Sequence, residues 1–191
     1  MKNKLPHALT ALSLAATAQA ASVPFNASYS GNSDVIELVN AVGPVLRFET
    51  VAAGTGSFDL LNYFSTDVID MSTGVGSGSN RFVAGNGDEL FSSFSIQVIP
   101  TAQANIVGLS GLATFTGGTG RFSQASGSAV LSGSGVFTSA SHAMATLEYS
   151  GSVAVVPEPS SAWLLLSGLA GVMLTLRRRF SSQRFRAGFG S

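Results

Sequence analysis

Few side chains in this 191-residue sequence have the chemistry of a catalytic or metal-binding group. Cysteine is absent from the sequence, which excludes thiolate metal sites, thiol redox centres and disulfides. The two histidines are His7 and His142, and only His142 lies outside the N-terminal twenty residues. A single histidine in a domain is more often a surface or packing residue than a catalytic base. No serine has the flanking glycines of a nucleophile elbow, and neither glycine-rich phosphate-binding motif occurs. We therefore expect a non-enzymatic protein with no catalytic residue, no cofactor and no metal site.

Carboxylates are the remaining chemical groups, and they are scattered along the chain. Residues 21 to 156 carry nine of them, at positions 34, 37, 49, 59, 67, 70, 88, 89 and 148. Two neighbouring carboxylates can cleave a glycosidic bond, but the sequence singles out no such pair. Asp67 and Asp70 are a weak candidate for calcium, although their spacing fits no familiar calcium loop. We expect Asp88 and Glu89 to be solvated charges at a hairpin, and we expect no buried polar cluster.

The charges are distributed unevenly. Residues 21 to 156 contain three arginines against the nine acids, a net charge of −6, whereas the other basic residues lie near the two ends of the chain. Nucleic-acid binding requires clustered Lys and Arg to neutralise phosphates. This acidic body therefore disfavours nucleic acid as a partner.

Apolar residues recur at every second position in the middle of the chain, as in half-buried strands. The clearest runs are 88 to 99, 106 to 116 and 142 to 155, and we also expect a strand at 34 to 40. Turn residues separate the runs at Asn86-Gly87, at 117 to 120 and at 132 to 135. The short connections predict an all-β domain over 21–155 with about eight antiparallel strands in a closed or nearly closed barrel. A two-sheet β-sandwich is the alternative.

The middle of the chain also has a resemblance of its own. The residues that carry it are GNGDEL at 85 to 90, FTGGTGRF at 115 to 122 and ASG at 125 to 127. They resemble a group of bacterial exported β-barrel proteins, whose GGTGRF turn also occurs in dirigent and allene oxide cyclase barrels. The resemblance covers roughly residues 75 to 150 and implies a barrel. The turn itself predicts Arg121 over the rim and Phe122 in the core.

Residues 1–20 have the pattern of a secretory signal peptide. Lys2 and Lys4 form a basic start, an Ala- and Leu-rich stretch follows, and the sequence Ala18-Gln19-Ala20 fits the small-x-small cleavage rule. We expect signal peptidase to cut after Ala20, with the next residue as the second choice. An ordinary N-terminal helix is the alternative.

Residues 156–191 are organised as a linker, an apolar segment and a basic end. Val156, Pro157, Glu158 and Pro159 form a stiff, extended step, because proline fixes φ and removes a backbone N–H. The uncharged segment 160–176 would make a transmembrane helix of roughly 26 Å, slightly short of a bilayer core of about 30 Å. By the positive-inside rule the arginines at 177 to 179 remain cytoplasmic. A buried helix of a soluble domain is the alternative.

This C-terminal segment resembles the PEP-CTERM sorting signal of Gram-negative bacteria. The match runs over 156–179 and consists of Val156-Pro157-Glu158-Pro159, the Trp- and Leu-rich apolar run, and Arg177-Arg178-Arg179. The resemblance implies recognition by an exosortase-type membrane protease that cuts near Pro-Glu-Pro. It also implies release to the cell exterior, often beside exopolysaccharide. A basic cytoplasmic tail, 180–191, departs from the family pattern, which usually ends within a few residues of the arginines.

Two functions from different classes follow from these patterns. The first is a non-enzymatic, secreted protein that passes through an inner-membrane-anchored intermediate with a cytoplasmic C-terminus. It is then sorted to the cell surface or extracellular matrix, in association with exopolysaccharide or biofilm. The second is a barrel that binds a small ligand, or a cyclase-like enzyme, as the shared turn suggests. Permanent anchoring by a single span would share the first topology without processing.

Overall fold

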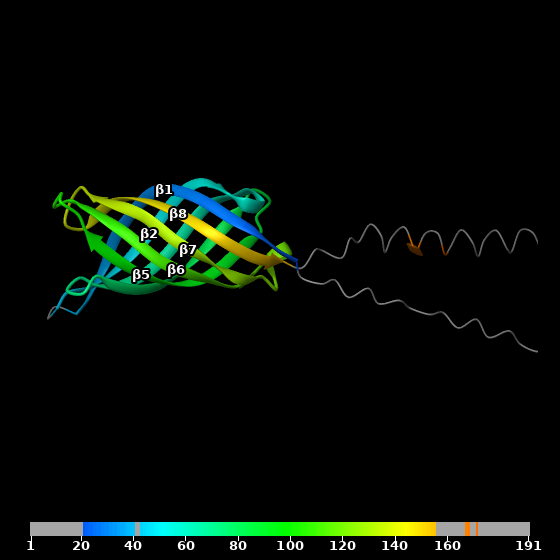
Figure 1. The fold of residues 1–191 in the computed structure, drawn as a ribbon, viewed down its shortest axis with the longest axis horizontal. Helices are drawn as coiled ribbons and strands as arrows, with labels where there is room; N and C mark the ends of the chain where they lie inside the picture. Colours follow the sequence, from blue (N-terminus) through cyan, green and yellow to red (C-terminus); the bar gives the residue numbers. More distant parts are fainter. Residues whose placement is uncertain (1–20, 41–42, 156–166, 169–170, 172–191) are drawn as a thin grey trace, which may run out of the picture.

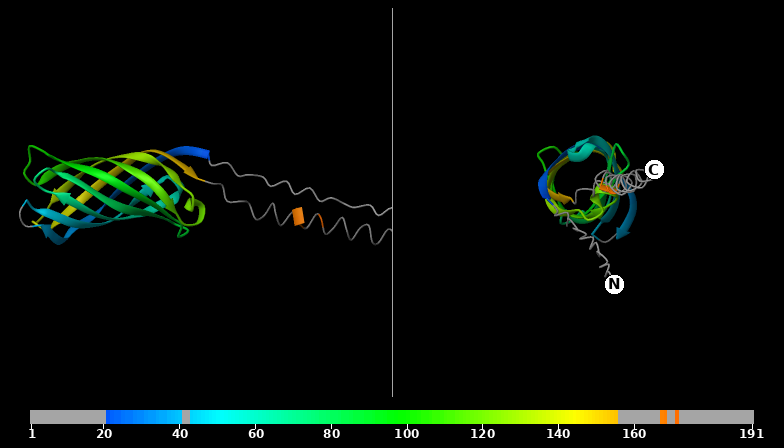
Figure 2. Two further views of the ribbon diagram at one scale, coloured as in Figure 1. Left: turned by 90° about the horizontal axis from the view of Figure 1, so that it is seen from below. Right: turned by 90° about the vertical axis from the view of Figure 1, so that its right-hand side faces the viewer.

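The computed structural model describes residues 21–40, 43–155, 167–168 and 171, and its body is one antiparallel β-barrel. Eight strands follow one another around the barrel in chain order, and β1 closes it by pairing with β8 (Figure 1 and Figure 2). The strands are β1 Ala21–Asn40, β2 Val45–Gly56, β3 Leu60–Asp70, β4 Val75–Ala84, β5 Glu89–Pro100, β6 Ile106–Gly118, β7 Ser126–Phe137 and β8 His142–Val155. Two short 3-10 turns, η1 Ser57–Asp59 and η2 Gly120–Phe122, lie in the connections. The predicted all-β barrel is confirmed, and the β-sandwich alternative is wrong.

The alternation seen in the sequence becomes an inside and an outside. In β5, β6 and β8 the predicted apolar positions face the interior. Ser93, Ser95 and Gln97 of β5, predicted for the opposite face, are exposed to solvent. The stretch at 34 to 40 is a strand, as expected, and forms the distal part of β1. Closure leaves no lateral sheet edge along most of the barrel, because each strand has a partner on both sides.

One predicted turn is wrong. The Ser-Gly repeat at 132 to 135 lies inside β7 and pairs along its length with β6 and β8. A methyl group added at Gly133 would stand 2.1 Å from the Thr146 carbonyl oxygen of β8. Glycine is needed there for close approach of two strands, whereas the sequence pattern alone indicated a reversal.

Aromatic side chains fill the barrel end at which β1 begins and β8 ends, which we call the terminal end. Phe25, Phe82 and Phe122 are fully buried there. The ring centroids of Phe25 and Phe115 lie 4.8 Å apart in an edge-to-face arrangement, and those of Phe58 and Phe122 lie 5.6 Å apart at 90°. Such contacts add to the hydrophobic gain from burial. The terminal end is therefore a packed core.

The opposite end, which we call the mouth, is formed by the hairpins β1–β2, β3–β4, β5–β6 and β7–β8. The β1–β2 hairpin extends beyond the start of β8, because β1 pairs with β2 up to Asn40 but with β8 only up to Asp34 (Figure 1). Ile36, Leu38 and Val39 on this projection are exposed. The mouth thus carries exposed apolar side chains, whereas the aromatic core of the terminal end is buried.

Both ends of the described barrel leave from the terminal end, because Ala21 pairs with Val155. The expected signal peptide at 1–20 and the sorting segment with its expected membrane helix at 160–176 lie outside the described residues, apart from three positions. Within the described part of the chain, no helix has the length and apolar character needed to cross a membrane.

Candidate ligand-binding cavity

A cavity of about 60 Å³ occupies the mouth half of the barrel interior. Its lining comes from seven strands and the β3–β4 turn, and it includes Ser33, Phe48, Thr50, Tyr63, Ser65, Asp67, Ile69, Met71, Phe94, Ile96, Val98, Val107, Leu109, Leu131, Gly135, Phe137, Ala143, Ala145 and Leu147. A cavity of this size exceeds the roughly 10–15 Å³ needed for one water molecule, and at about 30 Å³ per molecule, as in liquid water, it holds about two. The space exists because small residues such as Gly135, Ala143 and Ala145 stand where the terminal end has aromatic rings.

Most of the cavity wall is apolar, but one side is not. Phe48, Ile69 and Leu131 contribute hydrophobic surface, whereas the neighbouring strands β1, β2 and β3 contribute hydroxyl groups and a carboxyl group. Among these polar groups, the Thr50 hydroxyl donates a hydrogen bond to the Ser33 hydroxyl at 3.0 Å. This combination of apolar wall and a few convergent polar groups is typical of small-ligand sites.

Asp67 is the charged group of the polar side. Its side chain belongs to a residue only 7% exposed, and the Ser65 hydroxyl donates to it at 3.5 Å, the long limit for such a bond. Burial raises the pKa of the Asp67 carboxyl to about 6, and the Ser65 hydrogen bond lowers it by a smaller amount. At neutral pH a carboxylate therefore faces the cavity with one weak hydrogen bond from a side chain.

No cation of the described chain neutralises this carboxylate. Arginine and histidine supply every cationic side chain of residues 21–40 and 43–155, and each of them forms an ion pair elsewhere. The pairs are Arg47–Glu37, Arg81–Glu89, Arg121–Asp88 and His142–Asp34, all partly exposed on the outside of the barrel or at its terminal rim. The interior carboxylate is consequently without a counter-charge from the described part of the chain.

A second polar group lies deeper in the barrel and shares Tyr63 with the cavity. The Tyr149 hydroxyl donates to the Tyr63 hydroxyl at 3.0 Å, and the Asn80 amide donates to the Tyr149 hydroxyl at 3.2 Å. The Ser92 hydroxyl donates in turn to the Asn80 carbonyl oxygen. Burial raises the pKa of the Tyr63 and Tyr149 phenols, so both remain neutral at physiological pH. This network is a fixed, uncharged floor between the cavity and the aromatic core.

The expectation of no buried polar cluster is therefore wrong. Five polar residues of the described barrel are buried: Thr50, Ser65, Asp67, Asn80 and Ser92. Each stands at an inward position of its strand, as Ser92 does between Leu90 and Phe94. Strand parity could have revealed them, because a polar residue in step with buried apolar residues must face the same side.

The candidate calcium pair does not form. Asp67 and Asp70 are three residues apart on β3, so their side chains point to opposite faces, inward and outward. The Asp70 carboxylate accepts hydrogen bonds from the backbone N–H and the hydroxyl of Ser72 in the β3–β4 turn, which lower the pKa of Asp70. No group of three or more metal-ligating side chains occurs among the described residues.

The turn residues singled out in the sequence have structural partners at the terminal rim. The Asn86 side chain donates to the Asp88 carboxylate at 3.0 Å and the Arg121 guanidinium donates to it at 3.1 Å, and these bonds lower the pKa of Asp88. Phe122 is fully buried in the core, as expected. Asp88 is therefore half-buried and ion-paired, where the sequence suggested a solvated charge. Arg121 ties two turns together.

A separate shallow groove crosses the outer face over β2 to β6. Phe64 and Phe91 are half-buried in it, and the Arg81 guanidinium lies 4.4 Å from the centroid of the Phe64 ring. Serine and threonine hydroxyls from neighbouring strands surround these rings. A ligand could stack an apolar face on these aromatic rings while its polar groups form hydrogen bonds with the surrounding hydroxyl groups.

The expected processing residues Ala20, Val156 to Pro159 and Arg177 to Arg179 lie outside the described residues, and no geometry is assigned to them. His142, the lone histidine of the barrel, lies on its outer face beside Asp34 and away from the cavity. Comparison with known proteins gave no match to a family model, a curated protein or a solved structure.

Proposed function

We propose that this chain is a non-enzymatic exported protein, sorted to the cell surface or extracellular matrix through residues 156–179. The order of a basic start, a β-domain, a Pro-Glu-Pro step, an apolar segment and an arginine cluster in the sequence carries this proposal. The pairing of Ala21 with Val155 is compatible with it, because both outer segments then join the barrel at its terminal end. A barrel held to a membrane by that end would present its mouth to the exterior.

The intact mass of the protein from membrane and extracellular fractions of its native host tests this proposal. We expect a mature chain that begins at Ala21 and ends near Pro157. Replacing Arg177, Arg178 and Arg179 by alanine should leave the C-terminal segment uncut, whereas the matched change of Arg184 and Arg186 to alanine should not. A chain that retains residues 160 to 191 in every fraction would contradict sorting and indicate permanent anchoring.

The proposal also includes association with exopolysaccharide, and the outer groove over β2 to β6 supports this association. Sugar rings have apolar faces that stack on aromatic side chains, and their hydroxyl groups pair with groups such as those that surround Phe64 and Phe91. Retention of the purified full chain on exopolysaccharide from the host tests this part. We expect Phe64→Ala to reduce retention and Val130→Ala, on a different outer face, to leave it unchanged. Equal retention of both variants would contradict a role of the groove.

A second candidate function is the binding of a small ligand inside the barrel. The buried Asp67 carboxyl in the wall of an apolar cavity favours it. Asp67 and the Tyr63 phenol are the ionisable groups that line this cavity, a set more suited to holding a ligand than to two-group acid–base catalysis. Nuclear magnetic resonance shifts of mouth-half amides with a panel of neutral, anionic and cationic fragments test this function. Shifts confined to the outer face would contradict it.

A further inference from the structure

We propose that the mouth cavity binds a small organic cation, a primary ammonium group on a short apolar body, with the Asp67 carboxylate as its counter-ion. This inference rests on the second candidate function above and specifies its ligand class. Three observations support it. They are the cavity volume, the polar groups on one side of the cavity, and the absence of an internal counter-charge in the described barrel.

The unneutralised charge of Asp67 favours a cationic ligand. A carboxylate removed from water loses hydration energy, and the loss is offset when an opposite charge binds beside it. The four described cationic side chains already have carboxylate partners outside the cavity. Asp67 therefore has two ways to become neutral, namely to take up a proton or to bind a cation from solution.

The oxygen atoms on the polar side of the cavity match the hydrogen-bond donors of an ammonium group. An ammonium group has three N–H donors and needs three acceptors to replace its water. The polar side offers the carboxylate oxygens of Asp67 and the hydroxyl oxygens of Ser33, Thr50 and Ser65, all of which line the same cavity. Hydrogen bonds between an ionised donor and an ionised acceptor are shorter and stronger than neutral ones.

The same set argues against a metal ion. Calcium takes six to eight oxygen ligands and magnesium demands a near-octahedral shell, usually with more than one carboxylate or with phosphate. The cavity offers one carboxylate, and most of its remaining wall is hydrocarbon. An alkyl group attached to the cation would be in contact with that hydrocarbon, including Phe48, Ile69 and Leu131.

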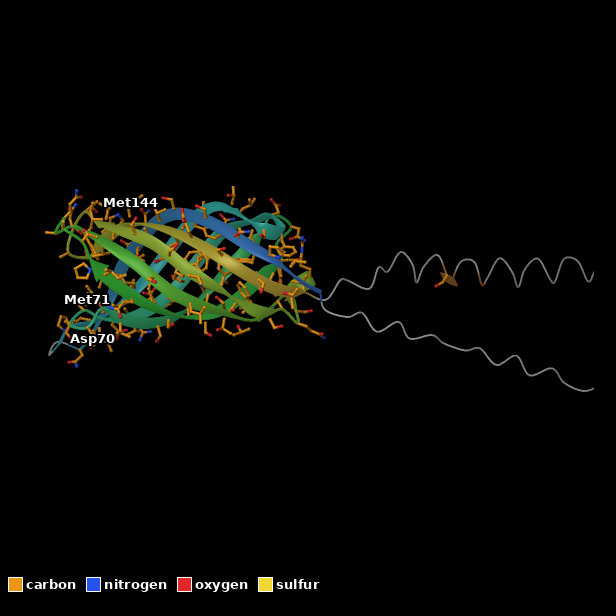
Figure 3. All side chains as sticks on the ribbon, in the orientation of Figure 1. Asp70, Met71 and Met144 are labelled. Carbon is orange, nitrogen blue, oxygen red and sulfur yellow. The ribbon has the colours of Figure 1, made fainter. Side chains whose placement is uncertain are left out.

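The volume of the cavity limits the size of the ligand. A volume of about 60 Å³ accepts a body that displaces about two waters, which corresponds to a few non-hydrogen atoms. Met71, which lines the cavity, is exposed at the mouth (Figure 3). A longer amphipathic amine could place its ammonium end at Asp67 and leave its tail in the mouth.

The pH dependence follows from the groups around Asp67. The strands beside it place Phe48 and Thr50 of β2 and Gly76 and Gly78 of β4 toward the interior, and none of these carries a charge. The interior phenols remain neutral, because burial raises the pKa of Tyr29, Tyr63 and Tyr149. Asp67 is therefore the group that charges as pH rises, and ammonium binding should strengthen as pH rises through about 6.

Three probes of nearly equal size separate this inference from general ligand binding. Propylammonium, 1-propanol and propionate are titrated into the purified full chain in non-ionic detergent, with amide shifts of residues 65, 67 and 69 and the heat of binding as readouts. At pH 8 we expect propylammonium to bind at least about tenfold more tightly than 1-propanol, because its bond to Asp67 is charge-assisted. Propionate should not bind, and at pH 4.5 the preference for propylammonium should disappear.

Substitution of the carboxyl group provides the matched test. Asp67→Asn should abolish the preference at pH 8, whereas Asp70→Asn, on the outward face of the same strand, should keep it. If Asp67→Asn does not fold, the pH comparison on the unchanged chain still decides. Equal binding of 1-propanol and propylammonium at pH 8 would overturn the cation inference and leave small-ligand binding standing. Binding of none of the probes would overturn both for a ligand of this size.

Discussion

The two halves of the barrel interior are built from the same strands but filled in different ways. At the terminal end Phe25, Phe82 and Phe122 are fully buried and pack edge to face. In the mouth half Gly135, Ala143 and Ala145 take the corresponding inward positions, and a cavity remains. One closed sheet thus provides a packed core in one half and a cavity in the other, and we expect the core half to contribute more of the stability.

Polar residues follow the same division. The Tyr63–Tyr149–Asn80–Ser92 network is satisfied internally and lies between the two halves. Asp67, on the mouth side, has one weak hydrogen bond from a side chain and no cation of the described barrel as a partner. A satisfied network adds uniqueness to a core, whereas an unneutralised carboxylate reduces stability and is typical of functional sites.

The largest expected effect tests where the stability lies. Phe82→Ala removes a fully buried ring that contacts Phe25, Tyr63 and Tyr149 among others, and should lower the free energy of unfolding by about 3–5 kcal/mol. Val98→Ala, at a partly exposed position in the mouth half, should cost about 1 kcal/mol or less, since less surface is buried. Urea unfolding of both variants measures the difference. Equal losses would contradict the division into a core and a site.

The next effect concerns the pH dependence of stability. The folded-state pKa of Asp67 is raised from 3.8 to about 6, so the folded chain holds this proton more tightly than the unfolded chain. Stability from this group is therefore full below about pH 4 and falls as pH rises to 6. Above pH 6, Asp67→Asn should raise the free energy of unfolding by about 2–3 kcal/mol, from roughly 1.36 kcal/mol per pKa unit.

Urea unfolding between pH 4 and pH 8 measures this effect. Near pH 4 the variant and the original chain should differ little, because Asp67 is then protonated in the folded state. Asp70→Asn is the control and should retain the fall in stability through this window. A variant that loses stability at pH 8 would contradict the burial of an unneutralised carboxylate.

A matched pair of alanines sharpens the comparison further. Ala113→Val adds volume to a fully buried position outside the cavity and should cost about 1–3 kcal/mol by overpacking. Ala145→Val adds the same volume beside the cavity and should change stability by less than about 1 kcal/mol while it weakens ligand binding. Thermal unfolding and the propylammonium titration report the two effects. Equal costs at both positions would mean that the mouth half is packed as densely as the core.

The smallest expected effect lies on the outer surface. Arg81→Gln breaks an ion pair with Glu89 and a stacking contact with Phe64, but all are partly exposed. Exposed ion pairs contribute about 0–1 kcal/mol, so the free energy of unfolding should change by no more than this. Unfolding in low and high salt checks it. A larger loss would place part of the stability of the terminal half on its outside.

Much of the fold was predictable from local pattern. The period-two runs in β5, β6 and β8 predicted their inward residues, and short connections predicted antiparallel pairing. The exception was the Ser-Gly repeat of β7, because glycine serves both turns and close strand approach, and the sequence does not separate these uses. The candidate site was harder. The sequence indicates Asp67 as one of an acidic pair with Asp70, not as an interior residue.

The sequence by itself determined β5, β6 and β8, their alternation and the placement of basic charge near the ends of the chain. Within β3, alternation places Asp67 on one strand face with Tyr63 and Ile69. The tertiary structure decided that this face is the inside of a barrel, and that Asn80 and Tyr149, 69 residues apart, meet there. It also decided that no described cation reaches Asp67. The physical reason is the distance along the chain over which each feature is set. Alternation depends on neighbouring residues, whereas burial, pairing and cavity volume depend on which distant strands close the sheet.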